Sequence, residues 1–331
     1  MEIAVFSTTP YERRYIEDAN ADAGHQLKFF DASLSLESAG LAAGCPAVCI
    51  FVNDRADAAV LEALQRGGTR LVALRCTGFN NIDLKAAASL GMKVVRVVDY
   101  SPNSVAEHAV ALLMAINRKI HRAYNRTRDS NFSLDGLIGF DLAGKTVAVV
   151  GTGKIGRIFA QIMLGFGCEV IGYDPNPHPE FEAMGARYAQ PGEIGVKADV
   201  VSLHCPLTPS TYHIINEKTL AQAKPGALLI NTSRGGLVDT EAVIDALKSG
   251  QLGGLAIDVY EQEADLFFRD LSSVVIADDV IQRLISFPNV IVTGHQAFLT
   301  REALTTICET TLRSVTAFER NEPLENEIKA A

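Results

Sequence analysis

Short apolar segments alternate with amphipathic segments from the start of the chain. Between the apolar segments, residues 11–23, 57–68 and 81–91 carry apolar positions at the spacing of surface helices. The apolar segments are rich in β-branched residues and have the length of strands; they lie at 2–7, 26–30, 47–52, 70–76 and 93–98. This alternation predicts a parallel sheet covered by helices, so residues 1–101 are expected to form an α/β domain of flavodoxin-like strand count.

The pattern changes after Tyr100. Residues 101–129 are amphipathic throughout and predict one long helix, with Ser101 as its cap and Pro102 in its first turn. A second alternating series follows, and a helix at 302–321 closes the chain. The strands expected in this series lie at 146–151, 169–174, 199–206, 227–233, 252–258 and 289–294. The predicted fold class is therefore α/β, with two Rossmann-like or flavodoxin-like doubly wound parallel sheets.

Size and charge narrow the class of function. A chain of 331 residues is too long for one ordinary core and suits two domains, and an apolar content of 48% is enough to build both. The net charge of −9 is spread along the chain without a long block of one sign. This distribution argues against nucleic acid or an anionic membrane as the main partner, and it is compatible with a pocket for a small anion.

Cysteine usage and the N-terminus bear on the compartment. The six cysteines are scattered and form no set with metal-ligand spacing, so free core thiols in a reducing compartment and no bound metal are expected. The N-terminus lacks the basic start and long apolar run of a signal peptide. The longest apolar helical stretch, 108–117, is too short to span a bilayer. A cytoplasmic protein without a membrane partner is therefore expected.

A glycine-rich turn joins an apolar strand to an apolar helix at residues 149–156. Gly151 permits the tight turn, Gly153 lets the backbone approach a pyrophosphate, and Gly156 lets helix and strand pack closely. The amides that open the helix would face the phosphates, favoured by the helix dipole. The other residues assigned to the cofactor in this turn are Thr152, Lys154 and Ile155.

An acidic residue follows the next strand, as a dinucleotide site requires. Asp174, preceded by Tyr173, lies where it can accept hydrogen bonds from the adenosine ribose. A carboxylate there would repel a 2′-phosphate, and residues 175–177 include no arginine. The sequence therefore predicts NAD rather than NADP. The alternative, a glycine turn made only for packing, is disfavoured by the strand, helix and acid together.

Polar residues also follow the remaining strands of the second series. Ligands of an open parallel sheet bind outside the carboxyl ends of its strands, so these residues are expected to share one crevice. They are His204 and Cys205, then Thr232, Ser233 and Arg234, then Asp258 and Glu263, and finally His295. A single histidine, arginine or glutamate at such a position is more often a structural or surface residue, and it is the dinucleotide signal that favours a functional role.

Three of these residues make a chemical set suited to a 2-hydroxy acid. The planar guanidinium of Arg234, followed by two glycines, could bind a carboxylate through two hydrogen bonds. His295 can move a proton on and off an alcohol oxygen, and a neighbouring Glu263 would favour the imidazolium and fix the ring. Hydride would then pass between the substrate and nicotinamide. Asp258 is expected to support the site rather than to take part in the chemistry.

The chain resembles the D-isomer-specific 2-hydroxyacid dehydrogenases over essentially its full length, and most closely their lactate-forming bacterial branch. The segments that carry the resemblance are 74–84, 106–129, 149–156, 202–209, 231–240, 258–268 and 293–300. The resemblance implies a substrate domain made of residues 1–101 and 297–331, with the NAD-binding domain, residues 102–296, inserted into it. The segment 265–284 is longer than the loop of many relatives and fits the lactate-forming branch.

The resemblance also implies a role for each candidate residue. Arg234 would bind the substrate carboxylate, His295 would be the acid/base, and Glu263 would pair with it. Backbone amides at Thr77 and Gly78 would add to the carboxylate site. Near the substrate methyl group would lie Tyr100 and Phe298, and around nicotinamide and ribose His204, Cys205, Pro206, Thr232, Ser233 and Asp258.

The activity implied by the resemblance is NAD-dependent reduction of pyruvate to D-lactate by a homo-oligomer. A broader 2-oxo acid, glyoxylate or hydroxypyruvate reductase would use the same chemistry. An NAD-sensing corepressor of this fold would act by binding proteins instead; it would be expected to carry a docking region, whereas this chain ends soon after its last helix. The L-lactate dehydrogenases differ, because their glycine turn lies near the N-terminus and their histidine pairs with aspartate.

Overall fold

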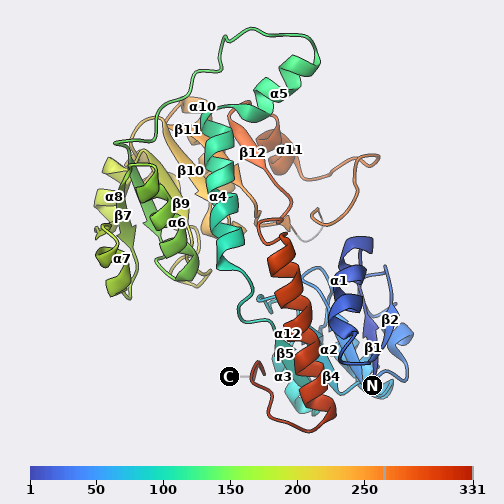
Figure 1. The fold of residues 1–331 in the computed structure, drawn as a ribbon. Coiled ribbons are helices and arrows are strands. Elements are labelled where there is room, and N and C mark those ends of the chain that lie inside the picture. Colours follow the sequence, from blue (N-terminus) through green and yellow to red (C-terminus); the bar gives the residue numbers. More distant parts are fainter. Residues whose placement is uncertain (264–265, 330–331) are drawn as a thin grey trace. The chain divides into compact units, whose positions relative to one another are not determined.

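The computed structural model describes residues 1–263 and 266–329 (Figure 1). The chain forms two compact units, one made of residues 1–101 and 299–331 and the other of residues 102–298. The segment 265–284, which the resemblance identified as longer than the loop of many relatives, begins at a residue outside the described part of the chain. None of the helices in the described ranges is both long and apolar enough to cross a membrane.

The first unit is built on a five-stranded sheet in the order β2-β1-β3-β4-β5, with every pairing parallel. Its strands are β1 (Glu2–Val5), β2 (Gln26–Phe29), β3 (Ala47–Ile50), β4 (Leu71–Leu74) and β5 (Lys93–Arg96). Its helices are α1 (Pro10–Asn20), η1 (Ala39–Ala42), α2 (Ala58–Arg66), α3 (Leu84–Ser89) and α12 (Arg301–Glu319). This strand order is the flavodoxin-like one, which confirms the predicted fold class for this unit.

The core of the first unit joins the two ends of the chain. All residues of β3 and β4 are buried, as expected of central parallel strands covered on both faces. Cys308, Leu312 and Val315 of α12 pack in one cluster with Ile3 and Val5 of β1. The last helix therefore completes the core that the first residues begin.

The second unit is built on a seven-stranded sheet in the order β12-β11-β10-β9-β6-β7-β8, again with every pairing parallel. Its strands are β6 (Thr146–Val150), β7 (Glu169–Tyr173), β8 (Arg187–Tyr188), β9 (Val200–Leu203), β10 (Ala227–Asn231), β11 (Leu252–Ile257) and β12 (Val290–Val292). The order reverses between β6 and β9, which is the Rossmann arrangement and confirms the predicted class. β8 was not predicted, because two residues are too short to show a period.

Helices cover the sheet of the second unit on both faces. They are α4 (Pro102–Asn117), α5 (Ile120–Arg128), α6 (Lys154–Gly165), α7 (Pro179–Ala183), α8 (Pro191–Lys197), α9 (Glu217–Ala221), η2 (Gly235–Leu237), α10 (Thr240–Ser249) and α11 (Asp279–Ile285). Apolar residues of α4 and α6 share one core cluster with β6. In Figure 1 these two helices lie side by side over the strands.

The prediction of one long helix at 101–129 was wrong. The segment forms α4 and α5, separated by Lys119 in the left-handed conformation at φ +53°. The buried side chain of Asn117 explains the break: its Nδ2 donates to the carbonyl of Phe140 at 2.8 Å, and its Oδ1 accepts from the Phe140 amide at 2.9 Å. Asn117 thus bonds to a distant loop where the helix would otherwise continue.

Candidate active site

The three glycines of the turn after β6 have different surroundings. Gly151 has φ +93°, and a Cβ there would lie 2.5 Å from the amide nitrogen of Cys205, so the turn packs directly on the loop after β9. A Cβ at Gly156 would overlap with the carbonyl oxygen of Gly151. At Gly153 a Cβ would meet no heavy atom within 4 Å. The first two glycines are required by packing, whereas Gly153 borders open space at the N-terminus of α6, where an anion is favoured.

Asp174 is tied to the same turn. Its Oδ2 accepts a hydrogen bond from the amide of Thr152 at 2.8 Å, and its Oδ1 accepts from the amide of Asn176 at 2.9 Å. Thr152 is fully buried, with its hydroxyl 2.8 Å from that of Tyr188. These bonds fix the carboxylate beside the glycine turn, and a carboxylate oxygen that accepts one amide can still accept a ribose hydroxyl.

An apolar cavity of about 280 Å³ lies on one face of the second unit's sheet. Val150 and Tyr173 line one part of it, and they precede Gly151 and Asp174 in the chain. The lining residues carry no charged side chain. The part of the cavity near the glycine turn suits a flat, uncharged ring such as adenine.

The loop after β9 holds a histidine and a cysteine that are both poor proton carriers. The Nε2 of His204 lies 2.9 Å from the hydroxyl of Ser202, and its ring packs on Phe159 with centroids 4.9 Å apart. Burial lowers the pKa of His204 to about 3 and raises the pKa of the Cys205 thiol to about 11. Both groups are therefore neutral at physiological pH, which suits residues that line a site rather than exchange protons in it.

The next loop, after β10, contains an orphan hydroxyl. The hydroxyl of Ser233 donates to the carbonyl of Cys205 at 2.7 Å, which joins this loop to the one after β9. The Oγ1 of Thr232 is buried, and the described part of the chain gives it no hydrogen-bond partner. Because buried polar groups are nearly always paired, this hydroxyl marks a place where a ligand group would fit.

Arg234 follows directly and is partly exposed. Its Nη1 donates to the carbonyl of Ser233 at 2.7 Å, and its own carbonyl accepts from Nδ2 of Asn231 at 2.8 Å. A Cβ at Gly235 would overlap with the backbone of Tyr260 and Glu261. Glycine at 235 therefore lets the loop of Arg234 interlock with the loop that follows β11.

The loops after β11 and β12 bring Glu263 and His295 together. Nδ1 of His295 lies 2.8 Å from Oε1 of Glu263, and Oε2 of Glu263 accepts from the Tyr260 amide at 3.0 Å. The two side chains remain 23% and 26% exposed, so small molecules can reach them. With Nδ1 engaged by the carboxylate, Nε2 is the nitrogen from which His295 can exchange a proton.

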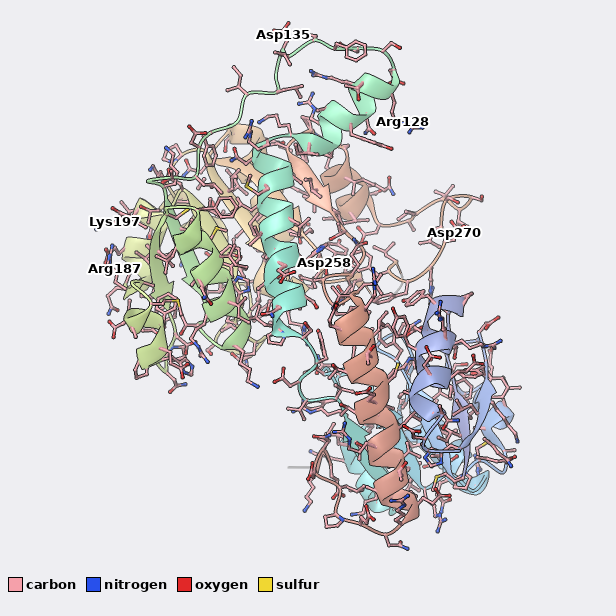
Figure 2. All side chains as sticks on the ribbon, viewed as in Figure 1. Arg128, Asp135, Arg187, Lys197, Asp258 and Asp270 are labelled. Carbon is pink, nitrogen blue, oxygen red and sulfur yellow. The ribbon has the colours of Figure 1, made fainter. Side chains whose placement is uncertain are left out.

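Asp258, labelled in Figure 2, organises the backbone around His295. Its carboxylate is fully buried and accepts hydrogen bonds from the hydroxyl of Thr293 and from the amides of Gln296 and Ala297. Burial raises the pKa of Asp258, but hydrogen bonds from His108, Thr293 and the two amides outweigh it, so the net pKa is lowered. The group is thus an ionised carboxylate that holds the 293–297 loop.

Sequence reasoning missed several residues that position this site. His108, Asn231, Tyr260 and Thr293 hold the predicted residues through the hydrogen bonds given above, and Nε2 of His108 lies 3.5 Å from Oδ1 of Asp258. Thr293 and Tyr260 lie within three residues of predicted ones and could have been suspected from that spacing. His108 could not, because it lies on a helix 150 residues from Asp258 in the chain.

Thr77, Gly78 and Tyr100 belong to the first unit. The carbonyl of Thr77 accepts from Nη1 of Arg96 at 2.9 Å, and the carbonyl of Gly78 accepts from the Cys76 thiol at 3.2 Å. Both carbonyls of the turn are thus held in place. Phe298 belongs to the second unit, and its predicted position near a substrate methyl group, like that of Tyr100, stays a prediction.

Comparison with known proteins gives consistent matches. Residues 110–297 match the family model described as "D-isomer specific 2-hydroxyacid dehydrogenase, NAD binding domain". The D-lactate dehydrogenase of Escherichia coli is 51% identical over 99% of this chain and 100% of its own length. A solved structure of the pyruvate reductase of Chlamydomonas reinhardtii is 45% identical, with a TM-score of 0.95 over 98% of both chains. The structure of a D-lactate dehydrogenase with NAD⁺ from Lactobacillus jensenii is 34% identical, with a TM-score of 0.84 over 100% of both chains.

Because Gly153 and Gly156 have different surroundings, alanine is expected to have different effects at the two positions. Gly156→Ala is expected to destabilise the protein by roughly 2–4 kcal/mol, because its Cβ would overlap with backbone that cannot move aside. Gly153→Ala is expected to fold normally and to weaken NADH binding by about tenfold or more, because its methyl group would occupy space that a pyrophosphate needs. Thermal unfolding and NADH fluorescence titration measure the two effects. Wild-type NADH affinity in Gly153→Ala would contradict the assignment of this turn.

Proposed function

The chain belongs to the D-isomer-specific 2-hydroxyacid dehydrogenase family, and from this we propose that it is an NAD-dependent enzyme that reduces pyruvate to D-lactate. The observation that carries the proposal is the hydrogen bond of 2.8 Å between His295 and Glu263 at the carboxyl edge of the second unit's sheet. The names of the relatives from Escherichia coli and Chlamydomonas reinhardtii support lactate and pyruvate as the substrate pair.

His295 is the proposed acid/base. During pyruvate reduction its imidazolium donates the Nε2 proton to the ketone oxygen as that oxygen becomes a hydroxyl, and in the reverse direction the neutral ring accepts it. Glu263 stabilises the imidazolium by charge and fixes the ring through Nδ1. Because Glu263 also accepts from the Tyr260 amide, its carboxylate is held in place before substrate binds.

Arg234 is the proposed carboxylate anchor. Its guanidinium is partly exposed beside the loop of Glu263, and a bidentate ion pair there would orient the substrate for attack at the carbonyl carbon. Backbone amides at Thr77 and Gly78 are proposed to add to this site, and Tyr100 and Phe298 to contact the methyl group. Close apolar contact of Tyr100 and Phe298 with the methyl group would favour pyruvate over longer 2-oxo acids.

NAD is the cofactor of the domain that the second unit matches, and the residues present fit it. When bound, NADH supplies the hydride. The proposed contacts are the turn from Gly151 to Gly156 for the pyrophosphate, Tyr173 and Asp174 for the adenosine, and His204, Cys205, Pro206, Thr232 and Ser233 for nicotinamide and its ribose. Asp258, which the resemblance also assigned to nicotinamide and ribose, is fully buried and is proposed to support the site by holding the 293–297 loop. The orphan hydroxyl of Thr232 and the open space at Gly153 support this assignment.

Steady-state rates of NADH oxidation across a series of 2-oxo acids, with chiral analysis of the product, test the proposed activity. The expected result is the highest kcat/KM with pyruvate and formation of D-lactate alone. A preference for glyoxylate, hydroxypyruvate or a longer 2-oxo acid would keep the chemistry and overturn the substrate. NADH binding without turnover of any 2-oxo acid, together with stable capture of protein partners, would favour a corepressor-like sensor instead.

The role of Glu263 predicts a shift in the pH dependence. In Glu263→Gln the imidazolium loses a charge-assisted hydrogen bond, so the alkaline limb of the pH profile for pyruvate reduction should move to lower pH. Glu261→Gln is the matched control, because that carboxylate pairs with His213 at 3.1 Å and not with His295. An unmoved limb in Glu263→Gln, or an equal shift in both variants, would refute the pairing as the source of acid/base function.

A homo-oligomer is proposed as the assembled form. α5 extends away from the second unit's sheet, and the segment after it returns toward the sheet through the region of Asp135 (Figures 1 and 2). Large apolar side chains are more than half exposed there: Ile120, Tyr124, Phe132, Leu134 and Ile138. Exposed apolar side chains of this size are typical of a surface that another copy covers.

The six free, buried thiols support the proposed cytoplasmic location, where a reducing environment keeps cysteines unpaired.

Sedimentation velocity of the wild type and of the double variant Leu134→Glu/Ile138→Glu tests the proposed assembly. The wild type should sediment as an oligomer and the variant as a monomer, because two charges would be buried in an apolar contact. Equal sedimentation of the two proteins as oligomers would place the contact elsewhere, and a monomeric wild type would overturn the proposed assembly.

A further inference from the structure

We propose that His108 of α4 is a positioning residue for His295 and that it acts through Thr293 and Asp258. The inference rests on the proposed role of His295 as acid/base. His108 is not among the residues that the sequence assigned to the site, and it does not touch His295.

The hydrogen-bond partners of His108 determine which of its ring nitrogens carries a hydrogen. Its Nε2 lies 3.2 Å from Oγ1 of Thr293 and 3.5 Å from Oδ1 of Asp258. The hydroxyl of Thr293 donates its single proton to Asp258, so its oxygen can only accept from His108. Nε2 of His108 must therefore carry a hydrogen, and the ring donates both to Thr293 and toward the carboxylate.

Asp258 in turn forms hydrogen bonds to the backbone of His295 and of the two residues that follow it. Its Oδ1 accepts from the Gln296 amide at 2.9 Å and its Oδ2 from the Ala297 amide at 2.8 Å. Its own carbonyl accepts from the His295 amide at 2.8 Å. His295 is thereby bound through its own amide and through the two residues that follow it.

This restraint matters because His295 has an unfavourable backbone conformation. Its φ of +54° lies in the left-handed region, which a residue with a side chain adopts only when its surroundings hold it there. Loss of the His108 donor leaves the buried carboxylate of Asp258 with one partner fewer. The 293–297 loop should then relax toward other conformations, and Nε2 of His295 should lose its alignment.

The two segments that His108 connects are also those at which the chain passes between the units. α4 begins at Pro102, directly after the chain leaves the first unit. The 293–297 loop ends one residue before Phe298, after which the chain returns to the first unit. The contact from His108 to Thr293 joins these two segments inside the second unit. It is therefore placed to fix the start of α4 against the loop of His295.

The test compares His108→Ala with His108→Gln, because the glutamine amide offers a donor at similar reach. In His108→Ala we expect kcat to fall about tenfold while the Kd for NADH stays within about twofold, since the lost bond orients His295 and does not bind cofactor. His108→Gln should recover most of the lost kcat. Hydrogen exchange at the amides of Gln296 and Ala297 should speed up in His108→Ala and return toward the wild-type rate in His108→Gln.

Two further variants separate positioning from general stability. Thr293→Val removes the contact with His108 together with the hydrogen bond from Thr293 to Asp258, so the double variant His108→Ala/Thr293→Val should lose little more kcat than Thr293→Val alone. His25→Gln is the structural control, because His25 is a buried histidine of the first unit that bonds to Thr316 at 2.9 Å. It should lower Tm without changing kcat or exchange at Gln296 and Ala297.

The proposal is overturned if kcat in His108→Ala falls no more than in His25→Gln, or if the His108 and Thr293 effects multiply. It is also overturned if exchange at Gln296 and Ala297 is unchanged in His108→Ala. A wild-type protein that turns over no 2-oxo acid defeats the proposed function instead, and the exchange rates then still decide whether His108 holds the loop.

Discussion

The hydrogen bond between Nδ1 of His295 and Oε1 of Glu263 is the interaction on which the proposed chemistry of this molecule depends. It exists because β11 and β12 are parallel neighbours whose register pairs Ile257 with Val292, so the loops that follow them begin side by side. The missing side chain at Gly235 then lets the loop of Arg234 pack against the backbone at Tyr260 and Glu261. The guanidinium of Arg234 and a carboxylate-paired imidazole are thereby brought to one edge of one sheet.

Two histidines near this edge show how surroundings assign roles to identical side chains. His204 packs on Phe159 and bonds to a serine hydroxyl, and burial keeps its ring neutral. His295 is partly exposed, and its Nδ1 faces the carboxylate of Glu263, so Nε2 remains open to a substrate. Only the second environment suits the proposed exchange of a proton with a substrate.

Much of the fold could be predicted from the sequence, because each strand is a short run of apolar residues and such runs are expected to be buried. The Rossmann class, the family and NAD as cofactor also followed from the glycine turn, Asp174 and the resemblance, and the comparisons confirm them. The break between α4 and α5 could not be predicted, because it depends on a tertiary contact from Asn117 to Phe140. The same limit applies to the site: residue types at strand ends predicted Arg234, Glu263 and His295 as candidates, but neither the carboxylate contacts of Asp258 nor the link from His108 can be read from spacing.

A crystal structure of the protein with NADH and oxamate, an isostere of pyruvate that is not reduced, would show whether Arg234 and His295 contact the substrate as proposed. The oxamate carboxylate is expected to bind the guanidinium of Arg234, and its carbonyl oxygen to lie about 3 Å from Nε2 of His295, with Glu263 still on Nδ1. A complex in which Nε2 of His295 points away from the ligand, or in which other residues hold the carboxylate while Arg234 stays in solvent, would contradict this proposal.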